Sequence, residues 1–291
     1  MLAEKKVALP PKTAPRFTTQ DLLQELQDGV SGILTSDDWR RHLEFQARFH
    51  RYSFGNQMLI AIQKPDATMV AGFHLWKRMS RNIRKGEKGI AILVPCFPRK
   101  DELEKDPDTP VFFKTAYVFD VSQTEGAPLP ETKVQRLQGE GEYASWLFER
   151  LADIAEEEGI RLDLDPSDLH GANGYYMPKK TLIAISPDLS PNHRVKTFVH
   201  EMAHHFCHKA GIVDTYAHGE AEAEGTAFVV CSHFGLDTSD YTFGYVAHWT
   251  GEEASKVIKS VGTTIQKISE ALIDRIDPPA LEEEKDEEMA L

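Results

Sequence analysis

The string His200-Glu201-Met202-Ala203-His204 constrains this chain more than any other segment. Positions four apart lie on one face of a helix, so His200 and His204 can direct two imidazoles at a single Zn²⁺. Glu201 lies beside them and is the candidate catalytic base for a water molecule at the metal. A solvated helix could carry the same letters by accident, and the flanking residues distinguish the two possibilities.

Those flanking residues predict a buried amphipathic helix. Ser190 is a candidate N-cap, Pro191 suits the first helical position, and Gly211 suits the end. Apolar residues recur between them at helical spacing. They are Val195, Phe198, Val199, Met202 and Phe206. The motif therefore lies in a helix with a core-facing stripe, where a metal site is expected.

A catalytic zinc site needs a third protein ligand and an open position. The metzincin spacing would place a histidine at position 210, which is Ala210 and excludes that class. His208 continues the row of histidines but lies a further turn away, and we expect it to be a polar residue at the helix end. Cys207 is expected to pack in the core as a small apolar residue.

A second predicted helix, at about 219–235, supplies better candidates. Glu220 and Glu224 fall on the face that carries its small residues, whereas Glu222 points about 200° away from Glu220. Small residues allow two helices to approach closely enough for a carboxylate to reach the metal. We therefore predict Glu220 as the third ligand and Glu224 as the acceptor that orients a ligand histidine. Glu222 is predicted to belong to a solvated acidic face.

Composition limits the remaining possibilities. A length of 291 residues indicates about two domains, and 41% hydrophobic residues can form real cores. No apolar run reaches the roughly 18 residues of a membrane span, and the N-terminus lacks the apolar region of a signal peptide. The three scattered cysteines favour reduced thiols. These features predict a cytoplasmic protein without a membrane partner.

The chain carries a net charge of −13, yet residues 39–100 hold 13 Lys and Arg against 3 acidic residues. Single-stranded DNA is bound by such cations together with aromatic faces that stack on bases. Phe49, Phe54 and Phe73 are expected in the core, and Trp76 could serve either purpose. The predicted DNA-binding residues are Arg48, Arg51, Tyr52, Asn56, Trp76, Lys77, Arg81, Arg84, Lys85 and Lys88.

The pattern of elements predicts an α+β protein of two domains. Helices are expected at about 17–29, 36–52, 53–64, 73–80, 140–158, 190–211, 219–235, 238–251 and 254–276. Strands are expected at 89–97 and 111–121, with a hairpin at 175–185. The predicted division is a disordered tail (1–15), an α/β module (16–128), a linker (129–139), a mostly helical domain (140–277) and an acidic tail (278–291).

The C-terminal region resembles a known family. HEMAHHFCH from His200, followed by ExEAEGTAFVVC from Glu220, is similar to the ImmA/IrrE-type zinc metallopeptidases. With the segment His233–Ser239, it resembles the C-terminal domain of ArdC-like antirestriction proteins. The resemblance implies a zincin-like domain of the gluzincin kind, with ligands at His200, His204 and Glu220. The ImmA/IrrE pattern usually has Asn where this chain has Glu224.

The basic segment resembles the N-terminal, single-stranded-DNA-binding domain of ArdC. The matching text is Tyr52–Gln57, Pro65–Gly72, Trp76, Arg84–Ile90 and Tyr117–Gln123. Several spaced motifs in one order are more specific than any one of them. The resemblance implies an α/β N-domain that binds single-stranded DNA and protects incoming plasmid or phage DNA from host restriction.

Three hypotheses follow. The first is an antirestriction protein with a DNA-binding N-domain and a zinc-metallopeptidase-like C-domain. The second is an ImmA-type protease that cleaves a repressor or host protein, with the N-domain only recruiting the substrate. The third is a binding protein whose zinc is structural. Glu201 argues against the third, because a closed structural site has no use for a catalytic base. The oxyanion donor stays open among His193, Tyr216, His218, Tyr241 and Tyr245.

Overall fold

The computed structural model describes residues 17–97, 110, 112–129, 140–169, 171–211, 216–239, 241, 243 and 251–278. The predicted tail at 1–15, nearly all of the linker and of the acidic tail, and most of the helix predicted at 238–251 lie outside these residues. Within them, no helix combines the length and apolar character that a bilayer crossing requires.

Three helices open the N-terminal part: α1 (Thr19–Ser31), α2 (Ser36–Arg48) and α3 (Phe54–Gln63). Thr18 and Thr35 each form a capping box with the aspartate three residues later, which satisfies the free N–H groups at the helix start. Ser53 accepts a hydrogen bond from the Asn56 N–H at the start of α3. These three predicted helices are therefore confirmed.

The helices pack on a small antiparallel sheet of order β1–β4–β3, formed by β1 (Val70–Gly72), β4 (Phe112–Asp120) and β3 (Ile90–Cys96). The short helix α4 (Phe73–Arg78) follows β1. A second, two-stranded sheet pairs β2 (Arg81–Ile83) with β5 (Thr124–Gly126). The sequence predicted β3 and β4 but not the three-residue strands.

Helix α3 also covers the free edge of β3. The Asn56 side-chain amide donates to the Leu93 carbonyl and accepts from the Leu93 N–H, both at 2.9 Å. Gln63, two turns later, does the same for Ala91 at 2.8 and 2.9 Å. Two side-chain amides thus replace a neighbouring strand, which protects an edge that would otherwise pair with another chain.

The C-terminal part begins with α5 (Glu140–Glu157) and a three-stranded sheet of order β6–β8–β7. Its strands are β6 (Arg161–Asp163), β7 (Gly174–Met177) and β8 (Leu182–Ile185), and β7 and β8 form the predicted hairpin. Three long helices follow: α6 (Pro191–Lys209), α7 (Tyr216–His233) and α8 (Gly251–Ile276). The predicted α+β class is confirmed.

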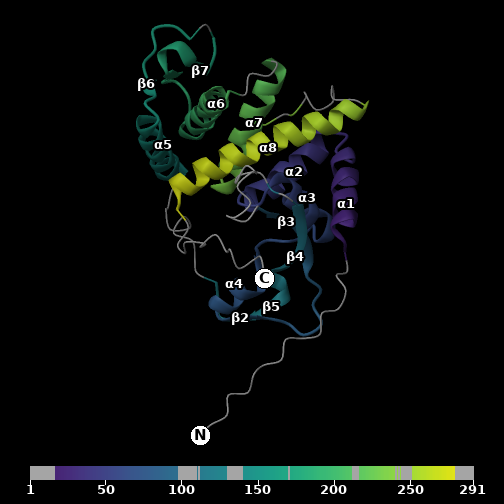
Figure 1. Cartoon of the computed structure of the whole chain (residues 1–291). Helices are drawn as coiled ribbons and strands as arrows, with labels where there is room; N and C mark the ends of the chain where they lie inside the picture. The colour runs from purple at the N-terminus through teal and green to yellow at the C-terminus, as the bar shows by residue number, and fades with distance from the viewer. Residues whose placement is uncertain are drawn as a thin grey trace.

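Both parts contribute to one hydrophobic core. Trp39, Leu43 and Phe54 of the N-terminal helices belong to the same cluster of buried side chains as Phe198 and Phe228 of α6 and α7. Helix α8 crosses the molecule from α5 to α1 and contacts helices of both parts (Figure 1). The two predicted domains are therefore packed together, and the exact limits of each stay a prediction.

The contact between α8 and α3 depends on Gly262. A Cβ at this position would lie 2.3 Å from a ring carbon of Phe54, which is closer than side chains approach. A hydrogen in place of a methyl group thus allows α8 to lie directly on the Phe54 ring.

Candidate metal centre

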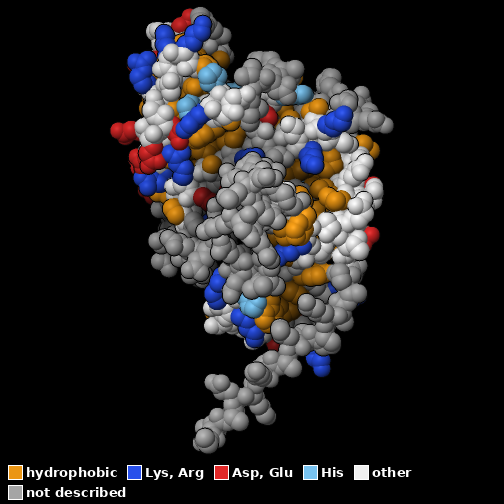
Figure 2. Space-filling model, viewed as in Figure 1, with side chains coloured by type: hydrophobic (Ala, Val, Ile, Leu, Met, Phe, Trp, Pro, Cys, Tyr) orange, Lys and Arg blue, Asp and Glu red, His pale blue; other side chains and the backbone are white. Residues whose placement is uncertain are grey.

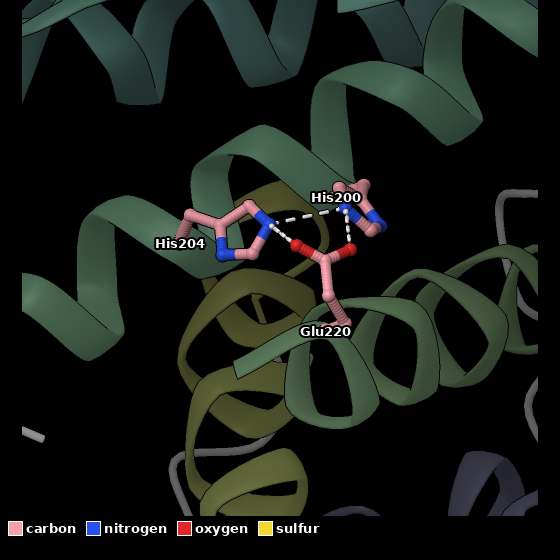
Figure 3. Close-up of side chains that lie close together, drawn as sticks. All are labelled: His200, His204 and Glu220. Atoms are coloured by element: carbon pink, nitrogen blue, oxygen red, sulfur yellow. Dashed lines mark hydrogen bonds and ion pairs between the residues drawn. The ribbon is translucent and has the colours of Figure 1, made fainter. Parts of the chain in front are cut away.

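Helices α6 and α7 bring three potential ligands together. His200 and His204 lie one turn apart on α6, and Glu220 projects towards both from the start of α7 (Figure 3). The two Nε2 atoms are 3.1 Å apart, and the Glu220 carboxylate oxygens lie 3.6 Å from His200 Nε2 and 3.5 Å from His204 Nε2. This is the one such group found among the described residues.

The arrangement fits one small metal ion. Zinc bound at about 2.0–2.1 Å in a tetrahedron separates its ligand atoms by roughly 3.3 Å. The three separations here bracket that value. Two imidazole nitrogens that face each other at hydrogen-bond distance, with a carboxylate beside both, form a donor set that can hold a metal.

Glu224, one turn beyond Glu220, contacts the far side of His200. Its Oε2 lies 3.4 Å from His200 Nδ1, and its Oε1 lies 3.4 Å from the ammonium of Lys196. Lys196 is one turn before His200 on α6, and its Nζ lies 3.6 Å from the centre of the buried Tyr241 ring. Lys196 therefore contacts the carboxylate that faces His200, and the sequence reasoning missed it.

These carboxylates control the protonation of His200. Burial disfavours the imidazolium, but hydrogen bonds from His200 to Glu220 and Glu224 outweigh burial and raise the pKa of His200 to about 9. Burial lowers the pKa of His204, and the positive charge of His200 lowers it further. The pair therefore holds one proton more readily than two.

Glu201 follows His200 on α6 and is a buried residue of that helix. It is 7% exposed, and burial raises the pKa of its carboxyl group to about 7 against the opposing charge of His200. The backbone N–H of Tyr176 in β7 donates to its carboxylate. Strand β7 can lie this close to α6 because Gly174 has no side chain: a Cβ there would lie 2.6 Å from Thr197 Cγ2.

The expectation for Glu222 was wrong. It is 3% exposed and accepts a hydrogen bond from Cys207 Sγ at 3.6 Å, so it contacts α6, the helix that carries His200 and His204. The reason is the packing of α7 between α6 and α8, which buries both sides of the helix. Cys207 is in the core as expected, and burial and Glu222 raise the pKa of its thiol to about 12.

The neighbouring histidines have other surroundings. His205 is buried, and its Nδ1 lies 3.0 Å from the Tyr176 hydroxyl. His208 is exposed at the helix end, as expected, and does not belong to the ligand group. Among the candidate oxyanion donors, Tyr241 donates its hydroxyl to Cys231 Sγ inside the core. The proximity of His205 and Tyr176 could not be predicted from the sequence, because the two residues meet only where β7 packs against α6.

Ten residues were predicted to bind DNA, and they differ in how far the structure exposes their side chains. Five are exposed: Arg48, Lys77, Arg84, Lys85 and Lys88. Trp76 is 0% exposed and its indole N–H donates to the Phe119 carbonyl at 2.8 Å, so it cannot present a face to a base. Phe73, expected in the core, is 47% exposed instead. Phe49 and Phe54 are buried as predicted.

The remaining four are only partly exposed and have partners within the protein. Among the five exposed residues, Arg48 also donates to the Ala67 carbonyl, Lys77 to Asn82 and Arg84 to Glu87. Arg51 forms an ion pair with Asp274 of α8 at 3.0 Å, and Tyr52 donates its hydroxyl to the Val70 carbonyl. Asn56 covers the edge of β3, as described above. Arg81 donates to the Thr124 hydroxyl and to the Ala127 carbonyl, which joins β2 to β5. These contacts give the four side chains structural roles, because each satisfies a backbone group or a charge inside the protein.

Comparison with known proteins agrees with both parts. Residues 14–119 match the model of the N-terminal domain of the anti-restriction factor ArdC, and residues 155–249 match the IrrE N-terminal-like domain. The chain is an ArdC-like protein. The second match includes His200, His204 and Glu220, so the candidate metal centre of this ArdC-like chain lies in its IrrE-like domain.

Two kinds of relatives are similar to the ArdC-like chain. The uncharacterized Bacillus anthracis protein pXO2-81 is 25% identical over 96% of this chain, which spans 55% of the length of that relative. The antirestriction ArdC protein from plasmid R388, solved with Mn(II), is 20% identical with a TM-score of 0.48, over 82% of this chain and 98% of that one. Its metal-free structure is 19% identical with the same TM-score, over 77% and 84%.

Proposed function

We propose that this protein is an antirestriction factor that binds single-stranded DNA through its N-terminal part and carries a zinc-metallopeptidase-like centre in its C-terminal part. The observation that carries the proposal is the combination, in one chain, of an ArdC-type N-terminal domain with a two-histidine, one-carboxylate ligand group. Antirestriction activity is named for the ArdC protein of plasmid R388, and we extend it to this chain as a proposal. We also propose that the protein acts in the cytoplasm.

The exposed cations support DNA binding. Lys77, Arg84, Lys85 and Lys88 are exposed along α4 and the turn between β2 and β3. Figure 2 displays Lys and Arg side chains gathered at the lower end of the molecule, over α4 and β2, next to hydrophobic side chains. A concentration of positive charge in an otherwise acidic chain is suited to a polyanion.

Zinc is the metal we propose, with His200, His204 and Glu220 as its ligands. Two imidazoles and a carboxylate with one position left open are typical of catalytic zinc sites. Zinc would supply a Lewis acid that lowers the pKa of water. Glu201 would accept a proton as a carboxylate and return it to a leaving amine. Burial raises the pKa of this carboxyl group in the metal-free protein, which favours its second role as a proton donor.

The second candidate is an ImmA-type protease in which the N-terminal part only recruits a protein substrate. One observation favours it: β7 is the edge strand of its sheet and lies directly against α6, beside Glu201. An extended peptide that paired with β7 would pass the ligand group. The antirestriction proposal is preferred because the exposed basic face has no role in this alternative.

Two measurements on the full chain test these proposals. Binding of a fluorescent single-stranded oligonucleotide is titrated at several salt concentrations, and log K should fall with log salt by about 0.7 for each phosphate contacted. Replacing Lys77, Arg84, Lys85 and Lys88 by Gln should weaken binding uniformly across sequences, whereas the exposed Lys179 and Lys180 of the C-terminal part provide the matched control. No binding, or binding without salt dependence, would contradict the first proposal.

The second measurement separates the two candidates. Host proteins are compared by mass spectrometry in cells that express the wild type or Glu201→Gln, with and without a restriction challenge. Protection that survives Glu201→Gln supports antirestriction through DNA binding. Loss of protection together with loss of a specific shortened protein supports the protease.

A further inference from the structure

Four large aromatic side chains are exposed among the described residues, and all are phenylalanines of the N-terminal part: Phe73, Phe97, Phe112 and Phe113. Phe73 is 47% exposed in the first turn of α4. An exposed aromatic ring leaves apolar surface in contact with water, and such surface can mark a binding site. Whether this ring can bind a ligand depends on the side chains around it.

The structure holds Phe73 outward. Trp76, three residues later in α4, is fully buried, and its indole N–H donates to the Phe119 carbonyl at 2.8 Å. With Trp76 fixed in the core, α4 cannot rotate to bury the Phe73 ring. The ring is therefore presented to solvent by an anchored helix, which keeps the entropic cost of contacting a ligand low.

Positive charge surrounds this ring. Lys77 is one turn further on the same face, and its Nζ lies 5.6 Å from the centre of the Phe73 ring. The His74 ring lies 5.6 Å away at an angle of 88°, and His74, Lys77 and Arg78 are all exposed. Residues 67–86 contain five Lys and Arg and no Asp or Glu. Figure 2 displays this mixture of blue and orange side chains over α4.

We propose that Phe73 is a stacking platform for one base of single-stranded DNA, with Lys77 and Arg78 binding the phosphates on either side. This proposal rests on the DNA binding proposed above and names the residue that recognises an unpaired base. Every base has a π-face, so stacking tolerates any sequence. In duplex DNA both faces of each base are covered by neighbours. The Phe73 surface therefore distinguishes a single strand from a duplex.

The test uses the full chain and two oligonucleotides of equal length, one of thymidines and one with abasic positions in its centre. Fluorescence anisotropy should give a dissociation constant for Phe73→Ala that is about five- to tenfold higher than wild type on the thymidine strand. The abasic strand should bind both proteins equally, since it has no base to stack. Phe73→Trp should restore binding, and the melting temperature should not change because the ring is half exposed.

Phe112→Ala is the matched control. Phe112 is 60% exposed and is the first residue of β4, whereas α4 contacts the last residues of that strand through Phe119. The Phe112→Ala variant should bind like the wild type. An unchanged dissociation constant for Phe73→Ala, an equal loss on the abasic strand, or an equal loss in Phe112→Ala would each overturn the platform. A wild type that binds no single strand would instead refute the DNA binding on which the platform rests, and the platform with it.

Discussion

The contact of Lys196 with Glu224 yields the sharpest prediction for the metal centre. Glu224→Gln removes the charge that faces His200 Nδ1 at 3.4 Å, and loss of such a partner typically weakens metal binding about 10–100-fold. Lys196→Met keeps most of the side-chain stem but removes the ammonium that holds the other carboxylate oxygen. The metal affinity should fall in both variants, by a smaller factor in the second.

The size of the Lys196 effect follows from its distance and exposure. At 3.4 Å and an effective dielectric constant of about 20, the attraction between the two charges is about 5 kcal/mol before desolvation. Both side chains are about a quarter exposed, so solvent reduces the net contribution to about 1 kcal/mol. This corresponds to about a fivefold loss of zinc affinity for Lys196→Met.

The assay is competition for zinc with a chelator of known affinity, carried out on the wild type, both single variants and the double variant. Because Lys196 acts only through Glu224, Lys196→Met should cause no further loss in the Glu224→Gln background. The melting temperature of each metal-free protein controls for unfolding. If Lys196→Met weakens zinc binding by the same factor in both backgrounds, the two residues are not coupled and the reasoning fails.

Four further predictions concern the site and the core. Glu201→Gln should retain zinc and the fold but abolish any peptidase activity, measured as cleavage of a substrate found in the comparison of host proteins; cleavage at the wild-type rate would exclude Glu201 as the base. Glu220→Ala should lose zinc steeply, and the zinc content of Glu224→Ala should lie between that of Glu220→Ala and that of the wild type. Glu222→Ala should retain zinc, but its melting temperature should fall because the substitution leaves a space beside Cys207. Zinc content is measured by mass spectrometry after matched dialysis, and stability by thermal melts. Zinc binding at pH 7 should release about one proton, because the pKa of His200 is raised to about 9 in the metal-free protein; calorimetry in buffers of different ionisation enthalpy measures it. Burial lowers the pKa of His42 from 6.5 to about 4, so its contribution to stability is complete above pH 6.5 and is lost as the pH falls towards 4. Between about pH 6 and pH 4.5, the free energy of unfolding, measured with urea at each pH, should therefore fall by about 1.4 kcal/mol less per pH unit in His42→Leu than in the wild type.

The helix that carries the histidine motif could be predicted because its signals are local. The positions of His200 and His204 depend only on a four-residue spacing, and Pro191 and Gly211 mark the ends with backbone chemistry of their own. The orientation of Glu220 also followed from helical geometry. Its assignment as a zinc ligand stays a prediction.

The surroundings of Trp76 and Phe73 could not be predicted in the same way. Helix α4 has six residues, which is too few for an apolar stripe to show which side faces a sheet. The deciding contact is with the Phe119 carbonyl, 43 positions away in the sequence. The three-residue strands β1, β2, β5 and β6 were missed for a similar reason, since so short a segment has too few alternations to be recognised.

Burial of Glu222 and the partners of Arg51 depend on how distant helices pack. An acidic residue on a polar-looking helix is normally solvated, and only the position of α6 beside α7 places Cys207 against Glu222. Likewise, Arg51 finds its counter-charge in Asp274, near the end of α8. Local spacing carries no information about either contact.

The common core has a practical consequence for dissecting this protein. A fragment that ended in the linker would leave the apolar surfaces of Trp39, Leu43 and Phe54 without the α6, α7 and α8 side chains that cover them. Such a fragment would be expected to aggregate, and its failure to bind DNA would say nothing about where DNA binds. Single substitutions in the intact chain should therefore be used to decide whether nuclease protection and proteolysis depend on the N-terminal or the C-terminal part. Each variant should first be shown to melt like the wild type.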